Sequence, residues 1–187
     1  MTMFLKYPLK FIIVAAIAFF FISGANVRRA ESAGLIDTSG DIGAAAIPLA
    51  AGILTLSKHD KEGAMEFLES YGTAVAATLA LKYVVKEERP NGEDNHSFPS
   101  LHASSSFAAA GYIQRRYGWV YGLPAYAVST YVCWTRIDAR EHFFSDVVVG
   151  AVIGFGASRI FTKPYKGVYV TPVTGKNLYG LEFTKTF

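Results

Sequence analysis

Six apolar stretches, separated by short polar segments, constrain the fold of this chain more than any other feature. Each stretch is rich in residues such as Ala, Leu and Val, and each is longer than an ordinary β-strand. The stretches cover residues 11–22, 41–57, 64–85, 102–116, 118–134 and 143–161. Helices of this composition bury most of their surface, either in a protein core or in a lipid bilayer. The sequence therefore predicts an all-α bundle of five to six helices.

The first stretch has the form of an export signal. Lys6 and Lys10 precede the apolar run 11–22, and small residues at 23–25 offer a cleavage site. Two arginines directly beyond this site disfavour cleavage. Residues 1–25 are therefore expected to be either a removed signal peptide or a retained signal anchor, and both place the chain in the export route.

The distribution of charge favours transmembrane helices. The chain is 51% hydrophobic with a mean hydropathy of +0.26, above a typical soluble enzyme but modest for a multispan protein. If the first segment starts in the cytoplasm and each later one crosses once, Lys58, Lys61, Arg115 and Arg116 lie inside, as the positive-inside rule expects. A soluble, exported helical enzyme is the alternative, because buried helices are also rich in Ala.

The end of the chain changes character. Residues 168–170 and 181–183 are typical of short strands, and turn-forming residues surround them. We expect residues 164–187 to form a separate β-like tail, possessing at most a small hairpin.

Three short clusters of polar residues follow one another in a fixed order. Written as patterns, they are K-x6-R-P, P-S-x-H and R-x5-H-x3-D. The clusters are Lys82 with Arg89 and Pro90, then Pro99, Ser100, Leu101 and His102, then Arg136 with His142 and Asp146. Each pattern is expected by chance in roughly a few per cent of chains this long. Under the alternating topology all three lie on the outer face, so they indicate one site.

The cations of these clusters are suited to binding phosphate. Lys82, Arg89 and Arg136 supply positive charge, and a guanidinium can bind a phosphate through two hydrogen bonds. Ser100 adds a hydroxyl, and the N–H of Leu101 at a helix start adds a further donor. Preorganised donors of this kind stabilise the charge of a phosphoryl group in transfer.

The imidazoles and the carboxylate supply the remaining chemistry. His142 and Asp146 are one helical turn apart, so a carboxylate could orient the ring and leave its other nitrogen free as a nucleophile. His102 is then the candidate general acid. The hypothesis is a phosphohistidine on His142, with no metal and no cofactor. A zinc site at His96, His102 and His142 is a weaker alternative.

Each cluster also has an ordinary explanation when taken alone. Lys82 and Arg89 could be a basic helix end, and Ser100 could be a helix N-cap. His142 and Asp146 could be a surface pair. The functional interpretation rests on the three occurring together.

The three clusters together resemble the signature of the type 2 phosphatidic acid phosphatase superfamily, over about residues 37–162. That superfamily includes membrane lipid phosphatases, soluble bacterial acid phosphatases and vanadium-dependent haloperoxidases. This chain departs from the usual pattern in two places, with Leu101 where Gly is usual and Thr135 where Ser is usual. Leucine restricts the close approach that glycine permits, so rate or substrate fit is expected to be affected more than the site itself.

The resemblance implies a phosphatase-like helical domain over residues 26–163. We expect a multi-pass protein of a bacterial-type inner (cytoplasmic) membrane. It would hydrolyse lipid phosphate mono- or diphosphate esters on the periplasmic face. Its partners would be a phosphorylated lipid and the bilayer. A net charge of +3 without a basic stripe argues against nucleic acid. The alternatives are a soluble exported acid phosphatase, a phosphotransferase, and a non-catalytic phosphate-binding membrane protein in which Leu101 has ended turnover.

Overall fold

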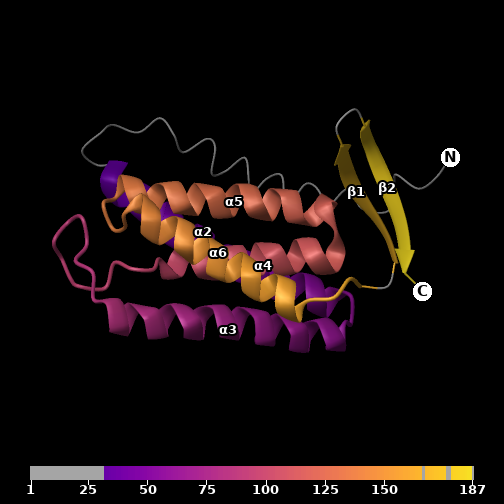
Figure 1. The fold of residues 1–187 in the computed structure, drawn as a ribbon, viewed down its shortest axis with the longest axis horizontal. Coiled ribbons are helices and arrows are strands. Elements are labelled where there is room, and N and C mark those ends of the chain that lie inside the picture. Colours follow the sequence, from indigo (N-terminus) through magenta and orange to yellow (C-terminus); the bar gives the residue numbers. More distant parts are fainter. Residues whose placement is uncertain (1–31, 166, 176–177, 187) are drawn as a thin grey trace.

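The computed structural model describes residues 32–165, 167–175 and 178–186 and contains five helices followed by a two-stranded hairpin. The helices are α2 (Ser32–Ser57), α3 (Lys61–Val85), α4 (Leu101–Tyr117), α5 (Trp119–Asp138) and α6 (Phe144–Phe161). They run roughly along one long axis (Figure 1). The predicted all-α bundle is confirmed. The expected signal segment, residues 1–25, lies outside the described residues.

The start of α2 differs from the sequence prediction. The apolar pattern indicated a helix from residue 41, whereas α2 begins at Ser32. Its first turns contain Asp37, Gly40 and Asp41, which interrupt any apolar run. These residues are helical because α5 packs against them and its Arg136 pairs with Asp37. A local hydrophobic pattern contains no information about such a contact.

Helix α4 is the centre of the bundle. It packs against α2, α3, α5 and α6, and in Figure 1 it lies between α5 and α3. Its buried positions are mostly small, and Ala103, Ser104, Ala108 and Ala109 are completely inaccessible to solvent. Small side chains allow neighbouring helices to approach closely, and this explains how one helix can contact four others.

Two glycines let α6 lie directly on the backbone of α4. A Cβ atom added to Gly150 would lie 2.5 Å from the carbonyl oxygen of Ser100, and one on Gly154 would lie 2.7 Å from the amide nitrogen of Ala108. This is the G-x-x-x-G spacing, which puts both glycines on one helix face. The contact also holds the start of α6 against the start of α4, where the N–H of Ser100 donates to the carbonyl of Asp146 over 3.0 Å.

Replacing Gly154 with Leu should therefore destabilise the protein. The added side chain would have to displace backbone atoms, and overpacking of this kind costs about 1–3 kcal/mol. Gly156→Leu is the matched control, because a Cβ at Gly156 would meet nothing within 4 Å. Thermal melting of both variants in the same detergent measures the effect, and equal melting temperatures would contradict the close α4–α6 contact.

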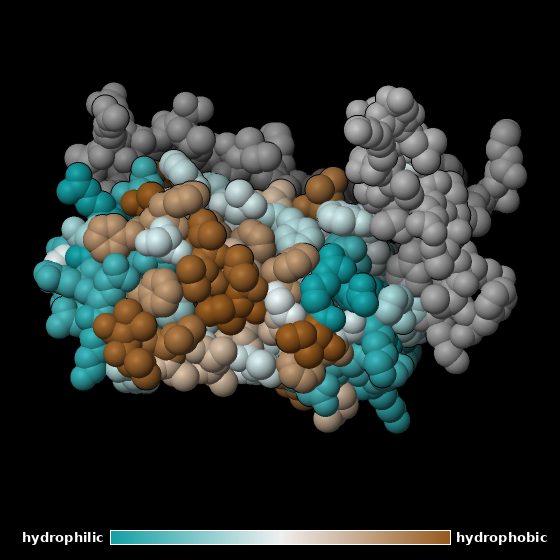
Figure 2. Space-filling model, in the orientation of Figure 1, coloured by the Kyte–Doolittle hydropathy of each residue, from teal (hydrophilic) through white to brown (hydrophobic). Residues whose placement is uncertain are grey.

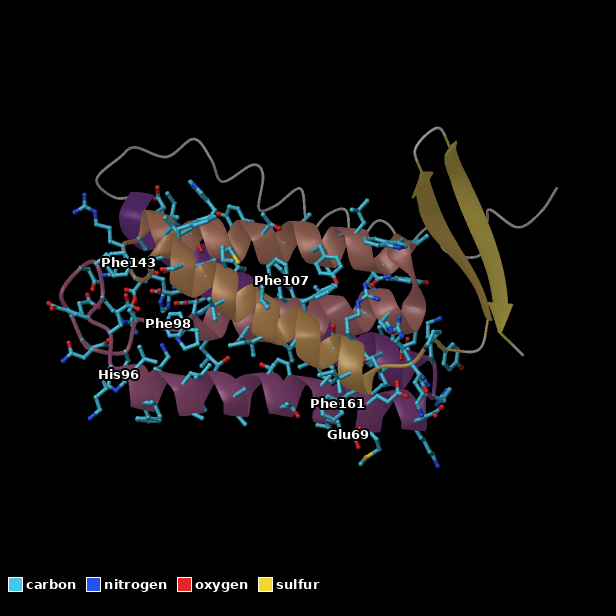
Figure 3. The ribbon with its side chains drawn as sticks, in the orientation of Figure 1. Glu69, His96, Phe98, Phe107, Phe143 and Phe161 are labelled. Carbon is cyan, nitrogen blue, oxygen red and sulfur yellow. The ribbon has the colours of Figure 1, made fainter. Side chains whose placement is uncertain are left out.

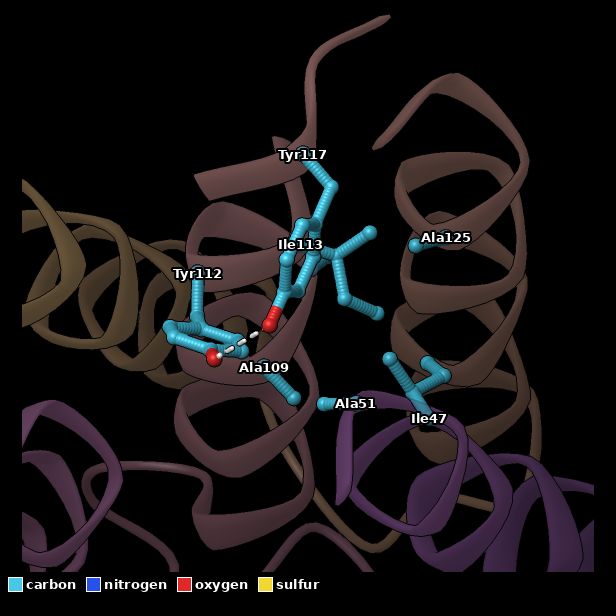
Figure 4. Close-up of a cluster of buried hydrophobic side chains, with 8 residues drawn as sticks. Ile47, Ala51, Ala109, Tyr112, Ile113, Tyr117 and Ala125 are labelled. Atoms are coloured by element: carbon cyan, nitrogen blue, oxygen red, sulfur yellow. Dashed lines mark hydrogen bonds between the residues drawn. The ribbon is translucent and has the colours of Figure 1, made fainter. Parts of the chain in front are cut away.

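The end of the bundle opposite the start of α4 is held by a buried ionic network. Arg116 binds both carboxylate oxygens of Asp60, at 2.7 and 2.8 Å, and also reaches Glu66 at 3.1 Å. The hydroxyl of Tyr117 donates to Asp60 over 2.9 Å. This network joins α4 to the turn between α2 and α3. The nearby apolar cluster includes Tyr112, whose hydroxyl lies 3.1 Å from that of Tyr117 (Figure 4).

The tail folds as an antiparallel hairpin of β1 (Gly167–Gly175) and β2 (Leu178–Thr186). The register pairs Gly167 with Thr186 and Gly175 with Leu178. The hairpin lies beyond the C-terminal end of α6, away from the start of α4 (Figure 1). The prediction of a small β-like tail is confirmed, and the tail does not contribute to the site described below.

Candidate functional site

The three polar clusters meet at one end of the bundle. Lys82 lies in the last turn of α3, His102 in the first turn of α4 and Arg136 in the last turn of α5. His142 lies in the connection from α5 to α6, and Asp146 lies in the first turn of α6. Consecutive helices run in opposite directions. The end of α3, the start of α4, the end of α5 and the start of α6 therefore lie at the same end of the bundle. Figure 3 labels His96, Phe98 and Phe143 at this end.

His142 and Asp146 form a buried pair rather than a surface pair. The side chain of His142 is 4% exposed and that of Asp146 is completely buried. Nδ1 of His142 lies 3.7 Å from Oδ2 of Asp146, which is close but too long for a hydrogen bond. The alternative of a solvated pair on the helix surface is therefore wrong.

Ser97 holds the carboxylate of Asp146 in place. Its hydroxyl donates to Oδ2 of Asp146 over 2.5 Å, and the N–H of Phe143 donates to the same oxygen over 2.9 Å. Ser97 is itself completely buried. Ser97 belongs to none of the three clusters predicted from the sequence. The only local signal was its place two residues before the P-S-x-H cluster.

The environment of His142 keeps its imidazole neutral. Burial, together with the positive charges of Lys82 and Arg89, lowers the pKa of His142 to about 4, although Asp146 acts in the opposite direction. A neutral imidazole has a nitrogen lone pair available for attack. The site therefore holds His142 in the protonation state that a nucleophile needs at neutral pH.

Arg136 is buried against two carboxylates of α2. Its Nη1 lies 2.9 Å from Oδ1 of Asp37 and 3.0 Å from Oδ1 of Asp41, and the Arg136 side chain is only 3% exposed. A side chain at Gly40 would collide with Thr135 and with the guanidinium of Arg136, so this glycine lets α2 approach. Neither aspartate was identified from the sequence, and their only signal there was i,i+4 spacing at the edge of an apolar stretch.

His102 shares one of these carboxylates. Its Nε2 lies 2.9 Å from Oδ1 of Asp41, the same oxygen that contacts Arg136. The candidate acid and one candidate phosphate ligand are therefore brought together through a residue of α2.

Arg89 and Lys82 bind acceptors in the polar loop between the first two clusters. Nε of Arg89 lies 2.8 Å from Oδ1 of Asp94, and its Nη1 pairs with Glu141. Nζ of Lys82 donates to the backbone carbonyls of His96 and Ser97. The loop therefore folds over the end of α3, beside the buried histidine. Glu141 is a further residue of the site that was not predicted from the sequence.

Ser100 is the N-cap of α4, which is the ordinary explanation given above for this residue. Its hydroxyl oxygen accepts from the N–H of Ala103 over 3.4 Å, and Ser100 is completely buried. Accepting this bond leaves the hydroxyl proton free to donate, so a cap can also be a phosphate ligand. Leu101 follows as the first residue of α4, where backbone N–H groups have no partner within the helix.

Over residues 32–165 and the two strands, the structure contains no group of three or more His, Cys, Asp or Glu side chains placed to hold a metal ion. His96 lies instead near Asp94, with 4.0 Å between Nδ1 and Oδ1.

Comparison with known proteins identifies the family. Residues 63–167, more than half of the chain, match the model of the PAP2 superfamily. The lipid A 4'-phosphatase of Helicobacter pylori is 29% identical over 147 residues, which cover 73% of this chain and 74% of that protein. The lipid A 1-phosphatase of Porphyromonas gingivalis is 30% identical over 155 residues, which cover 76% of this chain but only 35% of that longer protein.

The fold has a solved counterpart. The crystal structure of Aquifex aeolicus LpxE aligns with a TM-score of 0.60, at 20% sequence identity, over 81% of this chain and 91% of that chain. At this identity the likeness concerns the fold, and the fold agrees with the match of the family model. The chain therefore belongs to the PAP2 superfamily, the type 2 phosphatidic acid phosphatases.

Proposed function

We propose that this protein is an integral membrane enzyme that removes phosphate from a phosphorylated lipid through a phosphohistidine on His142. Its superfamily and its relatives named as lipid A phosphatases make it a phosphatase, a hydrolase of phosphate esters. The observation that carries the finer proposal is the buried pair of His142 and Asp146, which lies beside Lys82 and Arg89. Lipid A is the first candidate substrate, because both relatives are named for it.

The reaction follows from the roles of the two histidines. Nε2 of neutral His142 attacks the phosphorus, so that a P–N bond forms as the P–O bond to the lipid breaks. His102 gives its proton to the departing oxygen. Water then attacks the phosphohistidine while His102 takes up a proton from it. The P–N bond breaks, and inorganic phosphate leaves with both histidines in their starting states.

The remaining residues of the site stabilise charge and orientation. Asp146, fixed by Ser97, stabilises the positive charge that develops on His142 during attack. Lys82, Arg89 and Arg136 bind the phosphate oxygens, and we call these three cations, with the hydroxyl of Ser100 and the N–H of Leu101, the phosphate site. Positive charge held in a largely buried site stabilises a phosphoryl transition state without a metal.

The surface of the bundle supports a position in the membrane. Figure 2 shows apolar side chains over the middle of the helical bundle and polar ones toward its two ends. Large apolar side chains more than 60% exposed occur on four helices, and they include Leu49, Ile53, Leu68, Leu123, Val152 and Ile160. Among the described residues, Gly34–Ser57 and Phe144–Phe161 are long and apolar enough to span a bilayer. Exposed apolar area of this extent is typical of contact with lipid.

The orientation is inferred from charge. Lys58, Lys61, Arg115 and Lys163 lie at or just beyond helix ends opposite the phosphate site. Basic residues concentrate on the cytoplasmic side of membrane proteins. We therefore propose that the phosphate site faces the periplasm. Residues 1–25 would be the signal or anchor, and residues 26–163 the catalytic domain.

The pH dependence of activity should reflect the low pKa of His142. Because only the neutral imidazole can attack, kcat/KM should fall as the pH drops through about 4, rather than through the ordinary value of 6.5. Lys82→Met removes one of the charges that disfavour protonation and should move this acid limb to higher pH. Profiles from about pH 3 to about pH 7 on one substrate give the comparison, since ionisation of the substrate affects both proteins equally. Coincident limbs would contradict the assignment.

Phosphate release by the detergent-purified protein tests the function. The substrates should be lipid A, phosphatidic acid, a polyprenyl diphosphate and one water-soluble phosphomonoester, each with a chelator present. We expect chelator-resistant release from a lipid phosphate. Preference for the soluble ester, by a protein that needs no detergent, would support an exported acid phosphatase instead. Vanadate binding without any turnover, with turnover restored by Leu101→Gly, would support the non-catalytic alternative.

A further inference from the structure

Asp41 of α2 bridges two groups of the site with one oxygen. Its Oδ1 lies 3.0 Å from Nη1 of Arg136 and 2.9 Å from Nε2 of His102. The proposed reaction assigns Arg136 to a phosphate oxygen and His102 to the oxygen that leaves. A carboxylate oxygen therefore lies between the two groups that the proposed reaction assigns to oxygens of the substrate.

The burial of Arg136 explains why a carboxylate lies there. A guanidinium that is only 3% exposed needs a compensating negative charge. In the structure, Asp41 and Asp37 supply it, and the absence of a side chain at Gly40 allows them to come close. When a phosphate is bound, its own oxygens can replace the carboxylate as acceptors for Arg136.

Asp41 is placed to move away. Its side chain is 55% exposed, whereas that of Arg136 is fixed in the interior. The carboxylate can therefore rotate into solvent and be hydrated there, while Asp37 and the bound phosphate keep Arg136 neutralised. The other guanidinium of the phosphate site, that of Arg89, is likewise paired with carboxylates, those of Asp94 and Glu141. Both guanidinium groups of the phosphate site therefore contact carboxylates, which carry the same sign of charge as phosphate.

We propose, on the basis of the function proposed above, that Asp41 is a tethered competitor of phosphate that sets the specificity of the site. It fills part of the phosphate site in the free enzyme, is displaced by the substrate, and returns when inorganic phosphate leaves. A lipid substrate can displace it because its acyl chains add binding energy. A small phosphate anion lacks that contribution and is held weakly, so Asp41 limits product inhibition and favours lipid phosphates.

Asp41→Asn tests this proposal, because it keeps an oxygen that can accept from Arg136 and removes the charge. Isothermal titration of the full chain in detergent with vanadate, and with inorganic phosphate, measures anion affinity without turnover. We expect both dissociation constants to fall by about tenfold. The substitution removes a negative charge that competes with the anion for Arg136 and His102. Asp37→Asn should show a smaller decrease, because Asp37 contacts Arg136 but not His102.

Asp138→Asn is the matched control. This exposed residue ends α5 only two positions after Arg136, so the variant makes the same charge change near the site, and its anion affinity should equal that of the wild type. Unchanged or weaker vanadate binding by Asp41→Asn would overturn the proposal, as would a failure of both wild type and Asp41→Asn to bind. If Asp41→Asn does not fold, Asp37→Asn provides the test. Tighter vanadate binding by Asp37→Asn would support the proposal, and unchanged vanadate binding would contradict it. Absence of lipid phosphatase activity in the wild type would refute the proposed function while leaving this comparison of affinities decisive.

Discussion

Replacing His142 with Ala should abolish phosphate release and lower turnover by on the order of 10⁴-fold or more. The reason is that no other histidine is placed to replace it. His102 contacts Asp41, His96 lies in the loop near Asp94, and His59 lies between α2 and α3 at the other end of the bundle. Steady-state phosphate release from the preferred lipid measures the loss. The variant should keep its melting temperature and its affinity for inorganic phosphate within a small factor, because the cations of the phosphate site are unchanged.

The same variant tests whether the intermediate is covalent. Rapid quenching of the wild type with a labelled substrate should trap an acid-labile, base-stable phosphate on the protein, and His142→Ala should show none. His102→Ala should accumulate this intermediate when the leaving group is good, because departure no longer needs an acid whereas hydrolysis still needs a base. Full activity in His142→Ala would refute the phosphohistidine mechanism and leave the family assignment intact.

Replacing Arg136 with Ala should lower kcat/KM by on the order of 10³-fold, the scale on which single arginines stabilise phosphoryl transfer. The side chain is 3% exposed and fixed by Asp37 and Asp41, so its guanidinium is preorganised before the substrate arrives. Loss of the guanidinium also leaves two carboxylates facing the phosphate site, and these would repel the substrate. Both effects act in the same direction, which is why this loss should be among the largest.

Two comparisons show whether the Arg136 effect is specific. Arg136→Lys keeps the charge but loses the forked geometry, so it should recover only part of the activity. Arg159→Ala removes the same charge near the other end of the bundle, where Arg159 binds Gln114, and should leave activity unchanged. Activity of Arg136→Ala within about threefold of the wild type would show that Arg136 is structural, because its loss would then remove no transition-state stabilisation.

Much of the fold could be predicted because helices are encoded locally. Continuous apolar stretches gave α3, α4, α5 and α6 to within a few residues. The start of α2 could not be predicted in this way, because its first turns are polar and gain their stability from α5. The tail hairpin was predictable for the opposite reason, since its strand and turn residues are neighbours in sequence.

The candidate site, too, could be predicted only where its residues are close in sequence. Spacing within each cluster placed His142 near Asp146, and the alternation of helices brought the clusters to one end. The contacts of Arg136 with Asp41 and of Arg89 with Glu141 were missed, since they join residues 95 and 52 positions apart. No local pattern relates such residues, and an acidic residue near a helix end is ordinarily a solvated one.

The sequence by itself determined that the three polar clusters lie at one end of the bundle, because helix length and spacing are properties of neighbouring residues. The tertiary structure alone decided that His142 and Asp146 are buried, that Ser97 orients Asp146, and that Asp41 stands between Arg136 and His102. These features depend on how closely helices pack, through Gly40 on α2 and through Gly150 and Gly154 on α6. The distance between two helices is fixed by both surfaces at once, so neither segment specifies it alone.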